Sequence, residues 1–280
     1  MTNLPEKSEI KKAINAYCEK KGISKNELAT KIEVSGATLS KIEADNWESI
    51  NEKLWRKIWL CVGNDTTPDL FTTNDFTACN NACEIARKNR FMVGLIGDTG
   101  MGKTTALNHQ AMQKNTFYVA YDKTMKPKQF FISMLREMGI SFDGSINEMV
   151  NRISDELNAM SSPLLIIDEA GKITHTMILY LHVLRDKTNR NCGILLGGMP
   201  YFKTNLIKFS NKEKEGYAEF LRRINVWHTL KGLSRNEIRL ICEDYGITDA
   251  ETIREMMPNK RFGDLYNAIL LHQLELKETV

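Results

Sequence analysis

Two short segments constrain the fold of this chain more than any other feature. The first, GDTGMGKT at 97–104, fits the glycine-rich pattern G-x-x-x-x-G-K-[ST], and it lies between an apolar run at 91–96 and a helical pattern at 105–112. The second, LLIIDE at 164–169, is an apolar strand that ends in two carboxylates. Either segment alone is compatible with an ordinary turn or core strand. Together, in this order, they predict a nucleoside-triphosphate site at the carboxyl ends of parallel strands.

The residue types in these segments indicate separate tasks at that site. Backbone amides of the loop would wrap the phosphates at a helix N-terminus, and Lys103 would reach the β and γ oxygens. Thr104 and Asp168 are the predicted Mg²⁺ ligands, and Glu169 is the predicted base that polarises a water toward the γ-phosphate. The full predicted ATP-binding set is Gly97, Asp98, Thr99, Gly100, Met101, Gly102, Lys103, Thr104, Thr105 and Asp168, with Lys103 and Glu169 assigned to catalysis.

Composition leaves the partner of the protein open. The 280 residues include 38 Lys and Arg against 35 Asp and Glu, and a net charge of +3 is too small to indicate nucleic acid by itself. The six cysteines form no C-x-x-C pair and no Cys/His zinc pattern, which is typical of a reduced cytosolic protein. The polar N-terminus and the absence of a long apolar stretch predict a soluble, cytoplasmic protein that does not engage a membrane.

Residues 1–61 are predicted to form an all-helical domain. Within it, ISKNELATKIEVSGATLSKIE at 23–43 resembles the repressor-type helix-turn-helix family. That resemblance makes small and polar residues of the second short helix candidate DNA contacts, namely Ser35, Thr38, Ser40 and Lys41. A helical bundle used for protein contacts is the alternative. The stretch 62–75, rich in Thr, Asn, Asp and Pro, is predicted to be a linker.

From residue 76 onward, strand and helix patterns alternate. This alternation predicts an α/β domain over 76–231, with a parallel sheet covered by helices on both faces. Residues 232–280 are again helical and are predicted to form a lid. The basic stretch 203–214 is expected to be a surface loop.

The order of these parts resembles the AAA+ ATPases that select target DNA in transposition, the family of the phage Mu B protein. The segments that carry this resemblance are GDTGMGKT, LLIIDEA, ILLGGMPYFKTNL and AEFLRRINVWHTL. The resemblance implies an AAA+ P-loop core, ATP and Mg²⁺ as cofactors, and self-association into helical filaments on double-stranded DNA. It also implies slow ATP hydrolysis and recruitment of a transposase.

The resemblance further places an arginine finger at Arg222 or Arg223, just before the fifth strand. Two family positions differ in this chain. The polar residue expected after the fourth strand is Gly198, and the lid arginine of the G-x-x-R pattern is Tyr266, although Arg261 is close enough in sequence to substitute. Both differences imply slow hydrolysis, with ATP serving mainly as a switch for assembly.

The segment YDKTMKPK at 121–128 predicts a DNA-binding loop in the core. Its candidate contacts are Lys123, Thr124, Lys126 and Lys128, and Lys172 is a weaker candidate on the loop after Glu169. Clustered lysines can neutralise successive phosphates and gain affinity from counterion release without reading the sequence. A solvated surface loop is the alternative interpretation.

The sequence therefore predicts an ATP-dependent, largely non-sequence-specific DNA-binding ATPase that serves a transposase. Two other functions fit the same motifs. One is a regulator in which the helix-turn-helix reads an operator, and the other is a helicase-loader or replication-initiation ATPase.

Overall fold

The computed structural model describes residues 4–21, 24–32, 34–48, 50–62 and 70–278. These residues belong to two compact units, Met1–Leu70 and Phe71–Val280. Residues 63–69 of the predicted linker lie outside the described residues. Among the residues described, no helix has the length and apolar character that crossing a membrane requires.

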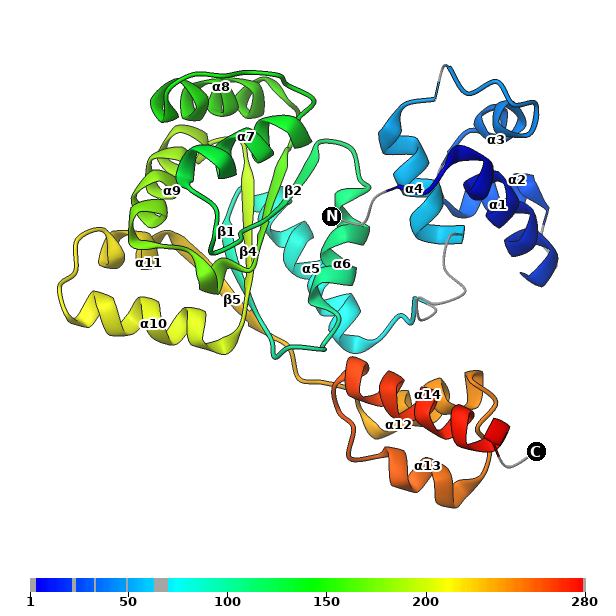
Figure 1. Ribbon diagram of the computed structural model, residues 1–280. Helices are drawn as coiled ribbons and strands as arrows, with labels where there is room; N and C mark the ends of the chain where they lie inside the picture. Colours follow the sequence, from blue (N-terminus) through cyan, green and yellow to red (C-terminus); the bar gives the residue numbers. More distant parts are fainter. Residues whose placement is uncertain (1–3, 22–23, 33, 49, 63–69, 279–280) are drawn as a thin grey trace. The chain divides into compact units, whose positions relative to one another are not determined.

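The first unit is all-helical (Figure 1). It contains α1 (Lys7–Lys21), α2 (Lys25–Lys31), α3 (Gly36–Glu43) and α4 (Glu52–Val62). Its core gathers aliphatic residues from all four helices around Trp55, which is 1% exposed. The two short helices α2 and α3 pack against each other, and their identity as a helix-turn-helix stays a prediction.

The second unit is built on a five-stranded parallel sheet with the order β2-β3-β4-β1-β5. The strands are β1 (Met92–Ile96), β2 (Thr116–Ala120), β3 (Leu164–Asp168), β4 (Gly193–Gly198) and β5 (Ile224–Thr229). The strands β1, β3 and β4 are continuous apolar runs because both of their faces are buried. The predicted α/β fold with a parallel sheet is confirmed.

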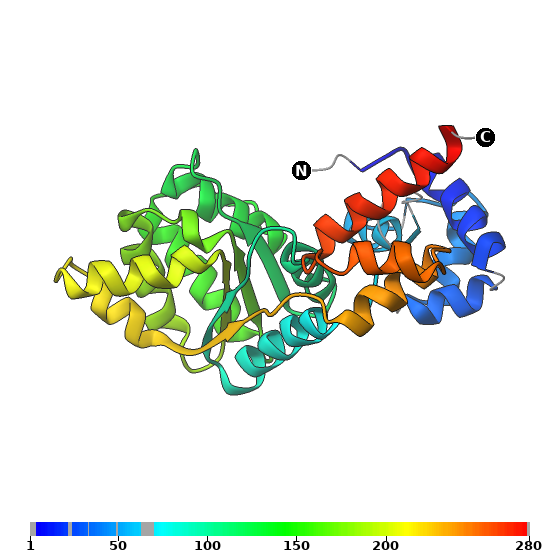
Figure 2. The same ribbon diagram turned by 90° about the horizontal axis from the view of Figure 1, so that it is seen from below.

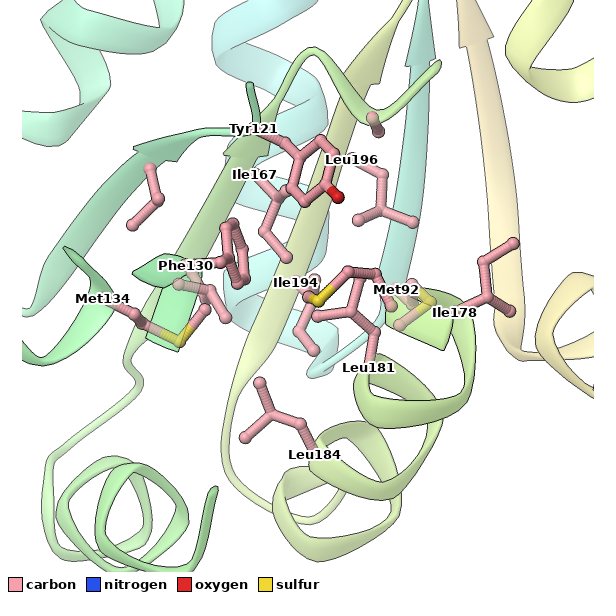
Figure 3. Packing of buried hydrophobic residues seen from close by; sticks show 14 of the residues in the cluster. Met92, Tyr121, Phe130, Met134, Ile167, Ile178, Leu181, Leu184, Ile194 and Leu196 are labelled. Carbon is pink, nitrogen blue, oxygen red and sulfur yellow. The ribbon is translucent and has the colours of Figure 1, made fainter. Parts of the chain in front are cut away.

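Helices cover both faces of this sheet (Figure 1). One face carries α5 (Asn74–Asn89) and α6 (Lys103–Ala111), and the other carries α7 (Pro127–Glu137), α8 (Ile146–Ala159), α9 (His175–Thr188), α10 (Pro200–Asn211) and α11 (Tyr217–Arg223). Figure 3 shows the apolar cluster on the second face, where Phe130, Leu181 and Ile194 pack between the sheet and its helices.

The segment 203–211, expected to be part of a surface loop, lies in helix α10. Phe202 and Leu206 are one turn apart and buried, which makes α10 an amphipathic helix. Lys208 is exposed on it, whereas Lys203 is half-buried with its ammonium over the Trp227 ring. Figure 2 shows α10 and α11, drawn in yellow, lying side by side.

The lid consists of α12 (Arg235–Asp244), α13 (Ala250–Met256) and α14 (Phe262–Glu278). Several contacts join it to the residues that precede β1. Phe71 packs against Phe262 of α14, and the buried carboxylate of Asp75 accepts hydrogen bonds from the amides of Lys231 and Gly232 at 2.9 and 2.8 Å. The last part of the predicted linker is therefore packed against the lid or included in α5.

The Asp75 bonds predict a measurable contribution to stability. Asp75→Ala leaves two partly buried backbone amides without their charged acceptor, so the free energy of unfolding should fall by about 2 kcal/mol. Asp155→Ala, which alters an exposed position of α8, is the control and should change it by less than about 0.5 kcal/mol. Equilibrium urea denaturation measures both. Equal effects of the two substitutions would show that Asp75 does not secure the lid.

Candidate nucleotide-binding site

The glycine-rich loop joins β1 to α6 and closes over the carboxyl end of the sheet. Gly100 and Gly102 have φ angles of +78° and +80°, in the left-handed region that favours glycine. The amide of Gly97 donates to the carbonyl of Gly198 at 3.2 Å, which ties the loop to β4. Lys103 follows directly as the first residue of α6.

Lys103 points back over this loop. Its Nζ donates to the carbonyl oxygens of Gly97 at 2.7 Å and Asp98 at 2.8 Å. Burial lowers the pKa of the Lys103 ammonium. The ammonium therefore lies at the mouth of the loop in partly dehydrated surroundings, where attraction to a polyphosphate is stronger than in water.

Asp168 is the most heavily bonded side chain of the site. It is 2% exposed, and its Oδ2 accepts hydrogen bonds from the Thr104 hydroxyl at 2.8 Å and the Tyr118 hydroxyl at 3.0 Å. Its Oδ1 accepts the backbone amide of Glu169 at 2.8 Å. Burial and the adjacent carboxylate raise the pKa of Tyr118, so its hydroxyl remains a donor. Thr104 and Asp168, the two predicted Mg²⁺ ligands, thus lie in direct contact.

Glu169 follows Asp168 in a left-handed conformation, with a φ of +58°. This turn carries its side chain toward solvent, where it is 40% exposed and pairs with Lys172 at 3.1 Å. Lys172, predicted as a DNA contact, is therefore bonded to the predicted catalytic base. Its electrostatic environment also includes Asp122, in the loop that follows β2.

These groups surround a cavity of about 290 Å³. It is lined by Thr99, Gly100, Met101, Gly102, Lys103, Thr104, Thr105, Asp168, Glu169, Gly198, Met199, Phe262 and Gly263. Backbone amides, an ammonium, a hydroxyl and a carboxylate together form a suitable donor set for a triphosphate with a hard divalent cation. Gly97 and Asp98 contribute the carbonyls that hold Lys103 and lie outside the lining.

The segment that holds both motifs is similar to a known family. Residues 86–206, which include both motifs, match the AAA domain family. No curated protein sequence matches the chain significantly.

Two solved structures share the fold of most of this chain. The Aeropyrum pernix ORC1 protein in complex with DNA has a TM-score of 0.55 and 14% identity, over 79% of this chain and 64% of that chain. The Aeropyrum pernix ORC2 protein in ADPNP-ADP complexes has a TM-score of 0.56 and 14% identity, over 77% and 66%. The chain thus spans slightly less than two thirds of each of these structures, and at this identity the likeness concerns the fold alone.

Gly198 and Tyr266, the two positions that differ from the expected pattern, each fit their surroundings. A Cβ at Gly198 would lie 3.3 Å from the Gly171 nitrogen and from Phe202, so the position is tightly packed and offers no amide to the cavity. Tyr266 lies within the lid, with its ring centroid 6.1 Å from that of Tyr245. Arg261 pairs with Asp264 beside the glycine-rich loop, and it does not line the cavity.

The lid reaches the glycine-rich loop through backbone contacts. Gly263, the second residue of α14, donates its amide to the carbonyl of Gly100 at 2.8 Å, and a Cβ there would lie 3.3 Å from the Gly100 Cα. Phe262 and Gly263 line the cavity, although the sequence did not predict them there. The G-x-x-R pattern directs attention to position 266, whereas the first turn of α14 makes the contact.

The two candidate finger arginines have different surroundings. Arg223 makes a two-point ion pair with Asp186, with N···O distances of 2.8 and 2.9 Å, and also donates to the Glu219 carbonyl at 3.0 Å. Arg222 is exposed and forms no ion pair with any residue that the structure describes. Arg222 is therefore the arginine available to another molecule.

The predicted DNA contacts of the core differ in the same way. Lys123 and Lys126 are exposed and have no ion pair within the described parts of the chain, whereas Lys128 pairs with Asp143 at 2.8 Å. The backbone and hydroxyl of Thr124 both donate to Asp122, which shapes the loop.

In the N-terminal unit, Ser35 caps α3. Its oxygen accepts the Thr38 amide at 3.1 Å and lies 2.8 Å from the Thr38 hydroxyl. The Ser40 hydroxyl donates to the Gly36 carbonyl at 3.1 Å, and the exposed Lys41 follows it on the same helix. The hydroxyls of Ser35, Thr38 and Ser40 thus all make local hydrogen bonds, and their role in DNA contact remains a prediction.

The two arginines should differ in their effect on stability. Arg223→Ala removes a two-point ion pair and should lower the free energy of unfolding by about 1 kcal/mol, whereas Arg222→Ala should change it by less than about 0.5 kcal/mol. Arg223 also lowers the pKa of Asp186 below its ordinary value. The contribution of the pair is therefore present at neutral pH and is lost as the pH falls through the folded-state pKa of Asp186. Urea denaturation at neutral and acidic pH measures this, and equal effects of the two variants would contradict the assignment.

Proposed function

We propose that this protein is an ATP-dependent, largely non-sequence-specific DNA-binding AAA+ ATPase that assembles on target DNA and recruits or activates a transposase. The observation that supports DNA-dependent ATP turnover most directly is the ion pair between Glu169 and Lys172. It joins the predicted catalytic base to a cation beside the lysine-bearing loop. The transposase is proposed from the resemblance of the motifs alone.

The cavity supports binding of ATP with Mg²⁺. Lys103 would exchange its loop carbonyls for phosphate oxygens, while Thr104 and Asp168 would hold Mg²⁺, which neutralises phosphate charge. Glu169 would orient the attacking water. Because Gly198 provides no amide to assist it, hydrolysis would be slow.

The loop after β2 provides the proposed connection to DNA. Ala120 pairs in register with Asp168, and the Tyr121 amide donates to the Asp168 carbonyl at 2.9 Å, so this loop begins beside the metal-binding carboxylate. DNA phosphates near Lys123 and Lys126 would also attract Lys172 and compete with Glu169 for it. Release of the Glu169 carboxylate would then stimulate hydrolysis.

A replication-initiation ATPase is the second candidate. The observation in its favour is the shared fold with the ORC1 protein in complex with DNA. Both functions use the same nucleotide site and differ in the partner. Stimulation of strand transfer by a transposase would support the first candidate, and transfer of a helicase ring onto DNA would support the second.

The exposed loop lysines predict the character of DNA binding. The double substitution of Lys123 and Lys126 by Ala should weaken ATP-dependent binding to random duplexes of any sequence and reduce the slope of log affinity against log salt by about two. Lys88→Ala is the control. Lys88 lies near the end of α5, just before β1 begins, and therefore at the amino ends of the strands, away from the loop that follows β2. Fluorescence anisotropy at several salt concentrations measures both.

The outcomes of this experiment distinguish DNA binding by the core loop from DNA binding by α3 of the N-terminal unit. Unchanged affinity and salt slope in the double variant would show that the loop does not bind DNA. Tight binding to one sequence without ATP would instead support the regulator, with α3 as its reading helix.

If ATP is bound between neighbouring subunits, two variants that are each inactive as ATPases should restore activity when mixed. If Arg222 of one subunit reaches the phosphate held by Lys103 of the next, Arg222→Ala protein should bind ATP but fail to hydrolyse it, and Lys103→Ala protein should fail to bind. Mixing them should restore part of the DNA-stimulated phosphate release, because some junctions combine an intact pocket with an intact arginine. Full activity of Arg222→Ala protein alone would show that the finger lies elsewhere.

A further inference from the structure

The buried carboxylate of Asp168 has a donor that the conventional roles of the two motifs do not explain. Thr104 and the Glu169 amide belong to the nucleotide motifs, whereas Tyr118 comes from β2, outside both of them. Its hydroxyl shares Oδ2 with the Thr104 hydroxyl. Two hydroxyls on one carboxylate oxygen fix the rotation of that carboxylate more tightly than one.

The strand register explains how Tyr118 reaches Asp168. Tyr118 pairs with Ile166 and Ala120 pairs with Asp168, so the contact is diagonal across two neighbouring parallel strands. Residues two apart on a strand point to the same face, and Ala120 extends no further than its Cβ. The Tyr118 hydroxyl can therefore reach Asp168 along this face without meeting a long side chain at position 120.

The ring itself is anchored independently of the glycine-rich loop. Tyr118 packs against the apolar cluster formed by α5, α6 and the strands, which includes Leu107 and Ile166, both fully buried. A donor mounted on this core keeps its position when the glycine-rich loop moves around a nucleotide. Thr104 has no such independence, because it is part of the loop-to-helix junction.

We infer that Tyr118 is a positioning residue that holds the Asp168 carboxylate in the orientation required to bind Mg²⁺, an inference that rests on the proposed nucleotide function. With Mg²⁺ bound, Thr104 would offer its oxygen to the cation, and the Tyr118 hydroxyl would still hold Oδ2 of Asp168. Without this hydroxyl, the Asp168 carboxylate loses its only hydrogen bond from a β2 side chain among the residues described. Partners of metal ligands that act in this way typically alter metal affinity by about 10-fold or more.

Tyr118→Phe removes the hydroxyl and preserves the ring, and Tyr121→Phe is its matched control. The Tyr121 hydroxyl is buried and has no hydrogen-bond partner within the described chain, and it lies among the apolar residues shown in Figure 3. Binding of a fluorescent ATP analogue would be titrated with Mg²⁺ and repeated in EDTA. In Tyr118→Phe protein the Mg²⁺ concentration at half-maximal binding should rise about 10-fold, while binding in EDTA stays at the parental level. Tyr121→Phe should match the parental protein in both.

A double-mutant cycle with Asp168→Asn distinguishes an effect of Tyr118 on the Asp168 carboxylate from a general loss of stability. If Tyr118 acts through Asp168, adding Tyr118→Phe to Asp168→Asn should shift the Mg²⁺ midpoint no further. Additive shifts, a parental midpoint in Tyr118→Phe protein, or equal shifts in the Tyr118 and Tyr121 variants would overturn the inference. If the parental protein binds no nucleotide at all, the proposed function itself fails, which is a distinct result.

Discussion

The buried carboxylate of Asp168 is the interaction on which the rest of the site depends. A carboxylate that is 2% exposed is costly to bury unless it is fully hydrogen-bonded, and here the donors come from α6, from β2 and from its own neighbour in sequence. Because β4 lies between β1 and β3, the glycine-rich loop and Asp168 meet across it. Gly197 of β4 is required at this point, since a Cβ there would lie 2.9 Å from Asp168 Oδ1.

The carboxyl ends of β2 and β3 bring the predicted catalytic residues close to the predicted DNA-binding loop. The last residues of β2 and β3 pair with each other. The lysine-bearing loop that follows β2 therefore starts beside Asp168 and Glu169. Glu169 is exposed and paired with Lys172, whereas Asp168 is buried and bonded within the core. In the proposed function, the buried carboxylate of Asp168 would bind the metal, and the carboxylate of Glu169 would act in turnover, where external charge can reach it.

The sequence predicted the parts of this structure that are encoded by local patterns. Continuous apolar runs and the two motifs were sufficient for β1, β3, β4 and the contact between Thr104 and Asp168. Long-range contacts could not be predicted. The Tyr118 contact depends on strand register, and the pairing of Arg223 with Asp186 joins residues 37 positions apart. The lysines spread over 203–214 obscured the apolar spacing of Phe202 and Leu206, which marks α10 as a helix.

The central claim is that ATP is bound through Lys103 and cleaved with the help of Glu169. The most direct test measures nucleotide binding and phosphate release side by side for Lys103→Ala and Glu169→Gln proteins in the presence of Mg²⁺ and duplex DNA. The account predicts that Lys103→Ala loses both activities, whereas Glu169→Gln retains binding and loses phosphate release, because its amide cannot accept the proton of the water. Phosphate release by Glu169→Gln protein at the parental rate would contradict it.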